Sequence, residues 1–245
     1  MNVGIFGAAG RMGQEVHRAV TADPDLTLVA EVDPQLGNTA DAMADAGVEV
    51  AIDFTVAESA LANGRWCAEH GIHAVIGTSG LTETQIDELR QAFTGTTANC
   101  LVAPNFAIGA VLMIKLAEIA APFFETAEVI ELHHDGKADA PSGTAIHTLE
   151  RLAAASPDWA PDPTRIETVP GSRGAVGAGG LRVHSVRLRG VVAHEEILLG
   201  TTGQTLTIRH DSYDRTSFMP GVVLAAKKIA EHPGLTVGLD AFLGL

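Results

Sequence analysis

The sequence predicts an α/β domain with a parallel sheet, followed by an α+β domain. Up to Ala103, short apolar runs alternate with amphipathic helical segments, a rhythm typical of right-handed βαβ units. The apolar runs lack polar alternation, as expected for strands that are buried on both faces. Between Leu181 and His210, three β-rich stretches follow one another through short connections, which favours neighbouring antiparallel strands.

The elements of the first part follow from these apolar runs and from helix-ending residues. Asp23-Pro24-Asp25 ends one expected helix, Gly71 ends another, and Thr82 is the expected N-cap of a third. The expected strands are Val3–Phe6, Leu26–Val32, Val50–Phe54, His73–Ile76 and Leu101–Ala103, and the expected helices are Arg11–Ala22, Glu58–Glu69 and Thr82–Phe93.

After Asn105 the rhythm changes, and a loop rich in proline and glycine between 155 and 180 is too irregular for assignment to elements. The periodicity of the C-terminal helix does not decide on which of the two domains it packs. The expected helices are 108–121, 142–154 and 218–230, and the expected strands are 127–132, 181–188, 192–199 and 204–210.

Composition excludes several classes of function. The chain has 16 Lys and Arg against 30 Asp and Glu, a formal charge of −14. Because nucleic-acid surfaces need clustered cations and anionic membranes repel a negative protein, we expect neither as a partner. No apolar run approaches the roughly 20 residues of a membrane span. The two cysteines, Cys67 and Cys100, show no CxxC spacing, so we expect a cytoplasmic protein without a disulfide framework.

A glycine-rich turn follows the first expected strand and opens the first expected helix. Gly7 to Gly13 reads GAAGRMG. Glycines at such a turn allow a tight bend, a close approach of the backbone to a pyrophosphate, and close packing of the helix on the sheet. The N-terminus of the helix then attracts the phosphates. The motif therefore favours a dinucleotide site, although a plain helix-opening turn gives the same pattern.

An acidic residue at the end of the second expected strand supports this interpretation. Asp33 stands about 20 residues after the last glycine, where a carboxylate accepts hydrogen bonds from an adenosine ribose. Glu31 is the alternative for this role, and a solvated loop carboxylate is the plain alternative. An acid there repels a 2′-phosphate, whereas Arg11 is able to stack on adenine or to neutralise such a phosphate.

The segment Glu131 to Thr144, ELHHDGKADAPSGT, carries most of the candidate chemistry. His133 and Lys137 would form an acid/base and anion-holding pair, and a helix start at Ser142 offers N–H groups to a carboxylate. A polar loop before an ordinary capped helix is the alternative. We expect no metal site, because adjacent histidines chelate one ion poorly and no HExxH spacing occurs.

The whole set of motifs resembles one family, the 4-hydroxy-tetrahydrodipicolinate reductases, also called dihydrodipicolinate reductases. The resemblance extends over essentially the whole chain, and the HHDGKADAPSGTA run is its most specific part. The matching segments are GAAGRMG from Gly7, DFT from Asp53, GTSG from Gly77, APNF from Ala103, ELHHDGK from Glu131 and DAPSGTA from Asp139.

The resemblance implies a Rossmann-like dinucleotide-binding domain, formed by residues 1–105 and 216–245. It also implies a substrate-binding and tetramerisation domain at 106–215, with a mixed, largely antiparallel sheet. NADH or NADPH would be bound by Gly7, Ala8, Ala9, Gly10, Arg11, Met12, Asp33, Gly77, Thr78, Ser79, Ala103, Pro104, Asn105 and Phe106. Ser79 stands where the family usually has threonine, and the hydroxyl is kept.

The resemblance further implies a reaction of lysine and diaminopimelate biosynthesis, the reduction of 4-hydroxy-tetrahydrodipicolinate, via dihydrodipicolinate, to tetrahydrodipicolinate. His133 would be the proton donor and Lys137 the second donor and anion partner. A protonated imidazole would add positive charge for this small dicarboxylate. His134, Ser142, Gly143 and Thr144 would hold the substrate, and the enzyme would be a homotetramer. The alternatives are another two-domain NAD(P)-dependent dehydrogenase and a non-catalytic NAD-sensing protein.

Overall fold

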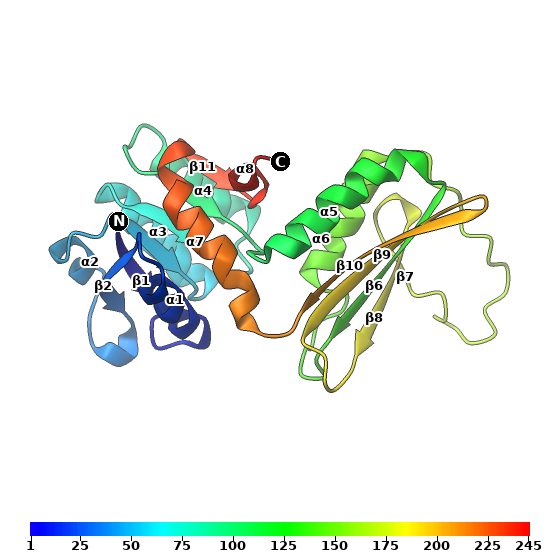
Figure 1. Cartoon of the computed structure of the whole chain (residues 1–245), viewed down its shortest axis with the longest axis horizontal. Coiled ribbons are helices and arrows are strands. Elements are labelled where there is room, and N and C mark those ends of the chain that lie inside the picture. Colours follow the sequence, from blue (N-terminus) through cyan, green and yellow to red (C-terminus); the bar gives the residue numbers. More distant parts are fainter. The chain divides into compact units, whose positions relative to one another are not determined.

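The computed structural model describes residues 1–245 and divides into two compact units (Figure 1). Unit 1 comprises Met1–Ile108 and Arg215–Leu245, and unit 2 comprises Gly109–Asp214. Each unit has its own sheet and its own apolar core. None of the helices combines the length and the apolar character that a membrane crossing requires.

Unit 1 contains a six-stranded sheet in which every pair of neighbours is parallel, in the order β11-β5-β4-β3-β1-β2. The residues of β3 are buried along its whole length, as the absence of alternation predicted. The prediction of a parallel α/β domain is thus confirmed. The strands are β1 Asn2–Phe6, β2 Thr27–Val32, β3 Val50–Asp53, β4 His73–Ile76, β5 Cys100–Val102 and β11 Leu235–Val237.

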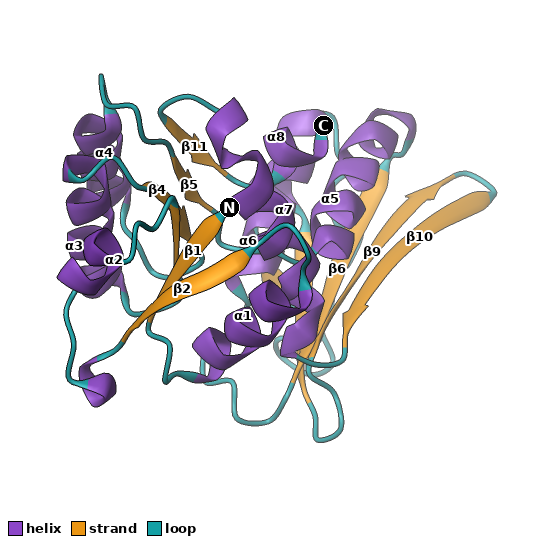
Figure 2. Cartoon of the chain, turned by 60° about the vertical axis from the view of Figure 1, so that its left-hand side comes forward, coloured by secondary structure: helices purple, strands orange, loops and turns teal.

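Helices cover both faces of this sheet: α3 and α4 lie on one side, α1 and α7 on the other (Figure 2). Thr82 caps α4 through a reciprocal bond pair with Gln85, which confirms the predicted start of this helix. The short α2, β11 and α8 were not predicted, because three to five residues carry too little periodicity. The helices are α1 Arg11–Ala22, α2 Asp41–Asp45, α3 Ala57–Glu69, α4 Glu83–Phe93, α7 Met219–Lys228 and α8 Asp240–Leu243.

Unit 2 contains a five-stranded sheet in the order β10-β9-β6-β8-β7. Only the β6–β8 pair is parallel, so the sheet is mixed and largely antiparallel, as predicted. Helices α5 and α6 pack their apolar side chains against one face of it (Figure 1). The elements are α5 Ile108–Ala120, β6 Thr126–His133, α6 Gly143–Ala155, β7 Ala175–Val176, β8 Arg182–Arg187, β9 Ala193–Thr201 and β10 Gln204–Ser212.

The predicted pairing of the β-rich stretches is half wrong. The turn at Thr202-Gly203 does join two paired strands, β9 and β10. The connection through Arg189-Gly190, in contrast, joins β8 and β9, and β6 lies between them. Five residues extend to roughly 16 Å, whereas two strands separated by a third lie only about 10 Å apart. A short connection is therefore compatible with paired strands and with strands that have a third strand between them. Hydrogen bonding between the strands decides which arrangement forms.

Candidate active site

The glycine turn closes the end of β1 in unit 1. Gly7 has a positive φ of 75°, and its N–H donates to the carbonyl oxygen of Val32 at 2.8 Å. A Cβ on Gly13 would come within 2.1 Å of the Gly7 carbonyl oxygen and 2.7 Å of the Ala8 Cα. The N-cap of α1, Gly10, has no side chain to satisfy the first N–H groups of the helix. The turn therefore has the features that a pyrophosphate-binding turn requires.

We expect Gly13→Ala to destabilise unit 1 by about 2 kcal/mol or more, because the new methyl group meets backbone that cannot move aside cheaply. NADH affinity should fall with it. Thermal melting and fluorescence titration with NADH measure both effects. Gly10→Ala serves as the graded control for stability, since its Cβ would lie 3.1 Å from the nearest atom. A Gly13→Ala protein with unchanged melting and NADH affinity would contradict the close packing.

Asp33 connects the end of β2 to the glycine turn. Its Oδ2 accepts a hydrogen bond from the Ala9 N–H at 3.1 Å, and its Oδ1 accepts from the Gln35 N–H at 2.9 Å. A carboxylate has about four acceptor sites, so two remain for ribose hydroxyls. The alternative residue, Glu31, pairs with His17 at 2.8 Å. The geometry therefore favours Asp33 over Glu31 for the ribose.

The remaining cofactor candidates follow the carboxyl ends of β4 and β5. Thr78 is buried, Ser79 is exposed, and Asn105 accepts a hydrogen bond from the Ala107 N–H at 2.9 Å. Phe106 is buried, and its ring centroid lies 5.8 Å from that of Phe54. Ligands of parallel α/β sheets bind at this edge, where the glycine turn after β1 also lies. The structure thus gathers the nucleotide candidates of unit 1 along one edge of one sheet.

Asp53 organises this edge, a role that was not predicted for it. Its side chain is 2 % exposed, and it accepts hydrogen bonds from Asn63 at 2.7 Å and from Thr78 at 3.1 Å. It also accepts from the N–H and the hydroxyl of Thr55. Asp53 therefore joins the loops after β3 and β4. An acidic residue at the end of a buried strand was the available signal.

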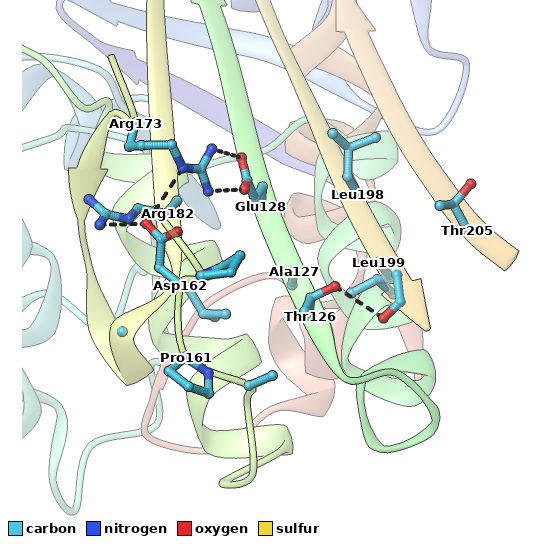
Figure 3. Close-up of a pocket in the computed structure, with 15 residues that line it drawn as sticks. Thr126, Ala127, Glu128, Pro161, Asp162, Arg173, Arg182, Leu198, Leu199 and Thr205 are labelled. Atoms are coloured by element: carbon cyan, nitrogen blue, oxygen red, sulfur yellow. Dashed lines mark hydrogen bonds and ion pairs between the residues drawn. The ribbon is translucent and has the colours of Figure 1, made fainter. Parts of the chain in front are cut away.

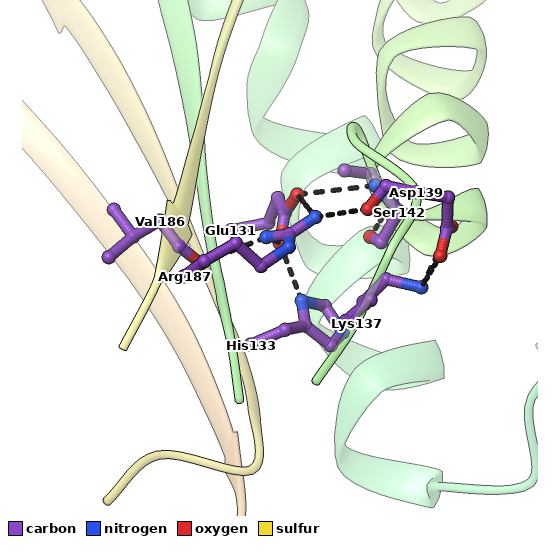
Figure 4. Close-up of polar contacts among 8 residues, drawn as sticks. Glu131, His133, Lys137, Asp139, Ser142, Val186 and Arg187 are labelled. Atoms are coloured by element: carbon purple, nitrogen blue, oxygen red, sulfur yellow. Dashed lines mark hydrogen bonds and ion pairs between the residues drawn. The ribbon is translucent and has the colours of Figure 1, made fainter. Parts of the chain in front are cut away.

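The two-histidine segment of unit 2 is built around a buried carboxylate (Figure 4). Glu131 is 0 % exposed and forms two parallel bonds of 2.9 Å with the guanidinium of Arg187. Its Oε1 accepts from the Ser142 N–H at 3.2 Å, and its Oε2 lies 2.5 Å from the Nδ1 of His133. Burial raises the pKa of Glu131, but hydrogen bonds from Arg187, Ser185 and His133 outweigh it, so the net shift is downward. Glu131 is therefore ionised at neutral pH.

His133 is neutral in the free protein at pH 7. Burial lowers the pKa of its imidazole, and the charges of Lys137 and Arg187 lower it further, whereas Glu131 acts in the opposite direction without reversing the shift. The protonated imidazole expected in the substrate complex is therefore not a charge that the free protein already holds. The physical reason is that burial of the imidazole removes water that would stabilise its charged form.

Lys137 and the start of α6 supply groups for an anion. The Lys137 ammonium contacts both carboxylate oxygens of the exposed Asp139 at 2.8 Å, a contact that a substrate carboxylate can replace. Ser142 is the N-cap of α6: its hydroxyl oxygen accepts from the Ala145 N–H at 3.1 Å. The N–H groups of Gly143 and Thr144 have no partner within the helix. A Cβ on Gly143 would meet open space.

Ser142 and His134, two of the predicted substrate-binding residues, differ in burial and in their free hydrogen-bonding groups. The buried Ser142 already uses its N–H for Glu131 and its hydroxyl oxygen for Ala145, so its main action is to shape the helix start. His134 is exposed, and its Nδ1 would lie 3.2 Å from a Cβ on Gly136. The structure therefore brings His133, Lys137 and the start of α6 together and places His134 at the surface.

A second buried carboxyl lies opposite Glu131 on the neighbouring strand. Glu195 is 4 % exposed and is the register partner of Glu131 across the β6–β9 pair. Burial raises the pKa of Glu195 to about 7, against the lowering effect of a hydrogen bond with Thr148, and the charge of Glu131 adds to the rise. The Thr148 hydroxyl has one hydrogen but faces two oxygens, those of Glu195 and of the Thr144 carbonyl. A proton on Glu195 satisfies both contacts.

The described cavity of about 370 Å³ lies elsewhere in unit 2 (Figure 3). It adjoins Thr126 at the start of β6, seven residues or roughly 23 Å from His133 at its end. Its charged groups pair with one another: Arg173 with Glu128, and Arg182 with Asp162 at 2.7 Å. This cavity is therefore separate from the candidate site around His133.

Comparison with known proteins decides the family. Two family models match: dihydrodipicolinate reductase, N-terminus, over residues 1–106, and dihydrodipicolinate reductase, C-terminus, over residues 109–243. The chain belongs to the dihydrodipicolinate reductase family. The boundary between the two family models falls beside Gly109, where the two units divide.

Individual relatives support the same family, and a more distant protein shares the fold. The chain is 52% identical over 250 residues to a 4-hydroxy-tetrahydrodipicolinate reductase of Nocardia farcinica, covering 100% of this chain and 99% of the relative. A dipicolinate-bound dihydrodipicolinate reductase from Paenisporosarcina sp. TG-14 superposes with a TM-score of 0.89 at 37% identity, covering 98% of both chains. An amine dehydrogenase of Mycobacterium smegmatis shares the fold alone, with 15% identity, a TM-score of 0.67, and coverage of 98% of this chain and 95% of that chain.

Proposed function

We propose that this protein reduces 4-hydroxy-tetrahydrodipicolinate, via dihydrodipicolinate, to tetrahydrodipicolinate with NADH or NADPH, in the biosynthesis of lysine and diaminopimelate. The main support is the 52% identity over the full length to a reductase of this name, combined with the position of the His133–Lys137 loop beside the N-terminus of α6. We assign the dinucleotide to residues 1–105 and 216–245, and the substrate to residues 106–215.

The residues of unit 1 fit a nicotinamide dinucleotide. The glycine turn offers the N–H groups of α1 to the pyrophosphate, and Asp33 has two acceptor sites left for the ribose. The loops after β4 and β5, from Gly77 to Ser79 and from Ala103 to Phe106, line the nicotinamide half. When bound, the reduced nicotinamide supplies a hydride to the unsaturated ring of the substrate.

The residues of unit 2 hold a small dianion in a protein of net charge −14. One substrate carboxylate takes the place of Asp139 at the Lys137 ammonium. The other accepts hydrogen bonds from the N–H groups of Gly143 and Thr144, with His134 at the edge of the site. Local cations and a helix N-terminus thereby capture an anion that the protein as a whole repels.

His133 supplies the proton that follows the hydride. Its imidazole is neutral in the free protein, and the negative charge of the bound substrate raises its pKa toward the protonated form. Substrate binding therefore draws a proton onto the group that must donate it. Proton donation by a positioned imidazole contributes on the order of 10² to 10⁴ in rate.

The direct test is a coupled assay with both cofactors. The condensation product of pyruvate and aspartate semialdehyde is prepared fresh, and the oxidation of NADH and of NADPH is followed by absorbance. Turnover with either cofactor is the expected result. Tight cofactor binding without oxidation of either would favour a regulatory protein instead. Turnover only with other imines or with sugars would favour another dehydrogenase.

Lys137→Ala is expected to weaken the binding of planar dicarboxylates by about tenfold or more, since a charge-assisted contact is worth roughly 1.5–3 kcal/mol. The inhibition constant of pyridine-2,6-dicarboxylate measures this. Lys115→Ala, on α5 and paired with Glu118, is the control for loss of a positive charge. Unchanged inhibition in Lys137→Ala would remove Lys137 from the site.

We further propose a homotetramer assembled through the sheet of unit 2. Within this unit, the face opposite α5 and α6 mixes half-buried apolar side chains such as Ile130 and Leu198 with charged ones such as Glu128, which pairs with Arg173. Burial of this face against other copies would remove its apolar side chains from water. Light scattering should give four times the 25.5 kDa of one chain; a monomeric mass would contradict the assembly.

The cytoplasm is the proposed location. Both cysteines are free and buried, and burial raises the pKa of each thiol. Buried protonated thiols are inert and suit a reducing compartment. Fractionation of the producing cell, followed by detection with an antibody, tests this location.

A further inference from the structure

The contact between Glu131 and His133 fixes where the imidazole carries its hydrogen. Glu131 receives two bonds from Arg187 and one from the Ser142 N–H, and all of these partners are donors. A carboxylate in such surroundings is ionised and has only acceptor sites. The hydrogen in the 2.5 Å contact with His133 therefore belongs to Nδ1 of the imidazole. A neutral imidazole has one N–H, so the lone pair is on Nε2.

The fold holds this contact from several sides. Glu131 and His133 are two residues apart on β6, so their side chains leave the same face of the sheet. Arg187 is the register partner of His133 on the neighbouring β8. The Ser142 N–H comes from the N-cap of α6. The carboxylate is thus fixed by two strands and a helix start before any ligand binds.

We propose that Glu131 is a positioning residue for His133, which selects the Nδ1–H tautomer and makes Nε2 the atom at which this imidazole exchanges protons. Arg187 keeps Glu131 ionised and in place. The catalytic meaning of this assignment rests on the proposed reductase activity. The tautomer itself is a property of the free chain.

Removal of the negative charge of Glu131 changes the pKa of His133 in a definite direction. The charged groups that face His133 are Glu131 on its own strand, Arg187 on β8 and Lys137 on the following loop. On the other side, β9 contributes the uncharged Ala193. Without the carboxylate only cations remain, and they oppose protonation of the imidazole. Glu131→Gln therefore lowers the pKa of His133, and less of the enzyme carries the proton at a given pH.

The first experiment uses the unaltered protein and needs no activity. The ¹⁵N chemical shifts of the histidine rings distinguish a protonated nitrogen from one with a lone pair, and the spectrum of His133→Asn identifies the signals of His133. Above the pKa of His133, the expected result is a protonated Nδ1 and an unprotonated Nε2. The opposite tautomer, with the proton on Nε2, would overturn the assignment.

The second experiment separates positioning from simple structural support. In Glu131→Gln, kcat is expected to fall about 10- to 100-fold with a much smaller change in KM. The alkaline limb of the pH profile should also move to lower pH. The double variant Glu131→Gln/Arg187→Met removes the unpaired guanidinium, so the limb should move back part of the way while kcat remains low. Glu118→Gln, which removes the carboxylate partner of Arg151 and Lys115 between α5 and α6, is the matched control and should change neither quantity.

The outcomes separate this proposal from the proposed function. A folded Glu131→Gln enzyme with the kcat and pH profile of the unaltered protein would overturn the positioning role. Inactivity of the unaltered protein toward the condensation product, together with the Nδ1–H tautomer, would refute the reductase assignment and leave the placement of the proton intact. If Glu131→Gln fails to fold, the tautomer measurement on the unaltered protein decides.

Discussion

His133→Gln is expected to lower kcat by roughly two to four decades while cofactor affinity changes little. Glutamine approximates the size and polarity of the imidazole, but it cannot take up and release a proton near neutral pH. Glu131 and Arg187 remain in place, since the two parallel bonds between them do not involve His133. Cofactor binding should therefore be retained when proton transfer by His133 is lost.

Steady-state turnover and fluorescence titration with NADH measure the two quantities separately. His147→Gln is the matched control, because His147 is an exposed histidine on α6 in the same unit. Its kcat should equal that of the unaltered protein. A His133→Gln enzyme with ordinary turnover would remove His133 from proton transfer.

Glu195→Gln is expected to stabilise the protein above neutral pH and to leave its stability nearly unchanged in acid. Burial raises the pKa of Glu195 from 4.5 to about 7 in the folded chain. Below about pH 4.5 the carboxyl is protonated in both the folded and the unfolded chain, so its titration does not change the free energy of unfolding. Between these values the folded chain keeps a proton that the unfolded chain releases, and stability falls as pH rises. Above pH 7 the loss levels off at about 3 kcal/mol.

Glutamine is a neutral side chain of the same shape, so it keeps the contact with Thr148 and removes the titration. The other groups that face Glu195 are Glu131 on β6 and His210 on β10, and both are present in each protein. Their titration therefore cancels to first order in the comparison. The stability difference between the two proteins isolates Glu195.

Urea unfolding at pH 5 and pH 8 provides the measurement. In a Trp66→Phe background the remaining tryptophan, Trp159, reports on unit 2, where its Nε1–H donates to the Leu152 carbonyl oxygen at 3.3 Å. The expected result is a gain of up to about 3 kcal/mol for Glu195→Gln at pH 8 and of roughly 1 kcal/mol or less at pH 5. Equal pH dependence of the two proteins would mean that Glu195 is ionised throughout.

The local features of this protein can be predicted from its amino-acid sequence. The buried strands of unit 1 appear as unalternated apolar runs, and the α4 start at Thr82 follows from a capping signal within four residues. The glycine turn and the His133–Lys137 loop are likewise readable, because each is a continuous segment whose residue types are tied to one chemistry. Periodicity, capping and turn chemistry act over a few residues, so they are visible without the fold.

The long-range pairings, in contrast, become visible only in the folded chain. The position of β6 between β8 and β9 follows from strand pairing that a five-residue connection does not specify. Arg187 reaches Glu131 across 56 residues of sequence, and Glu195 comes to lie opposite Glu131 through the register of two strands. These contacts set the protonation of His133 and Glu195 through burial and neighbouring charge. Both quantities depend on the packed interior, and no local pattern in the chain encodes them.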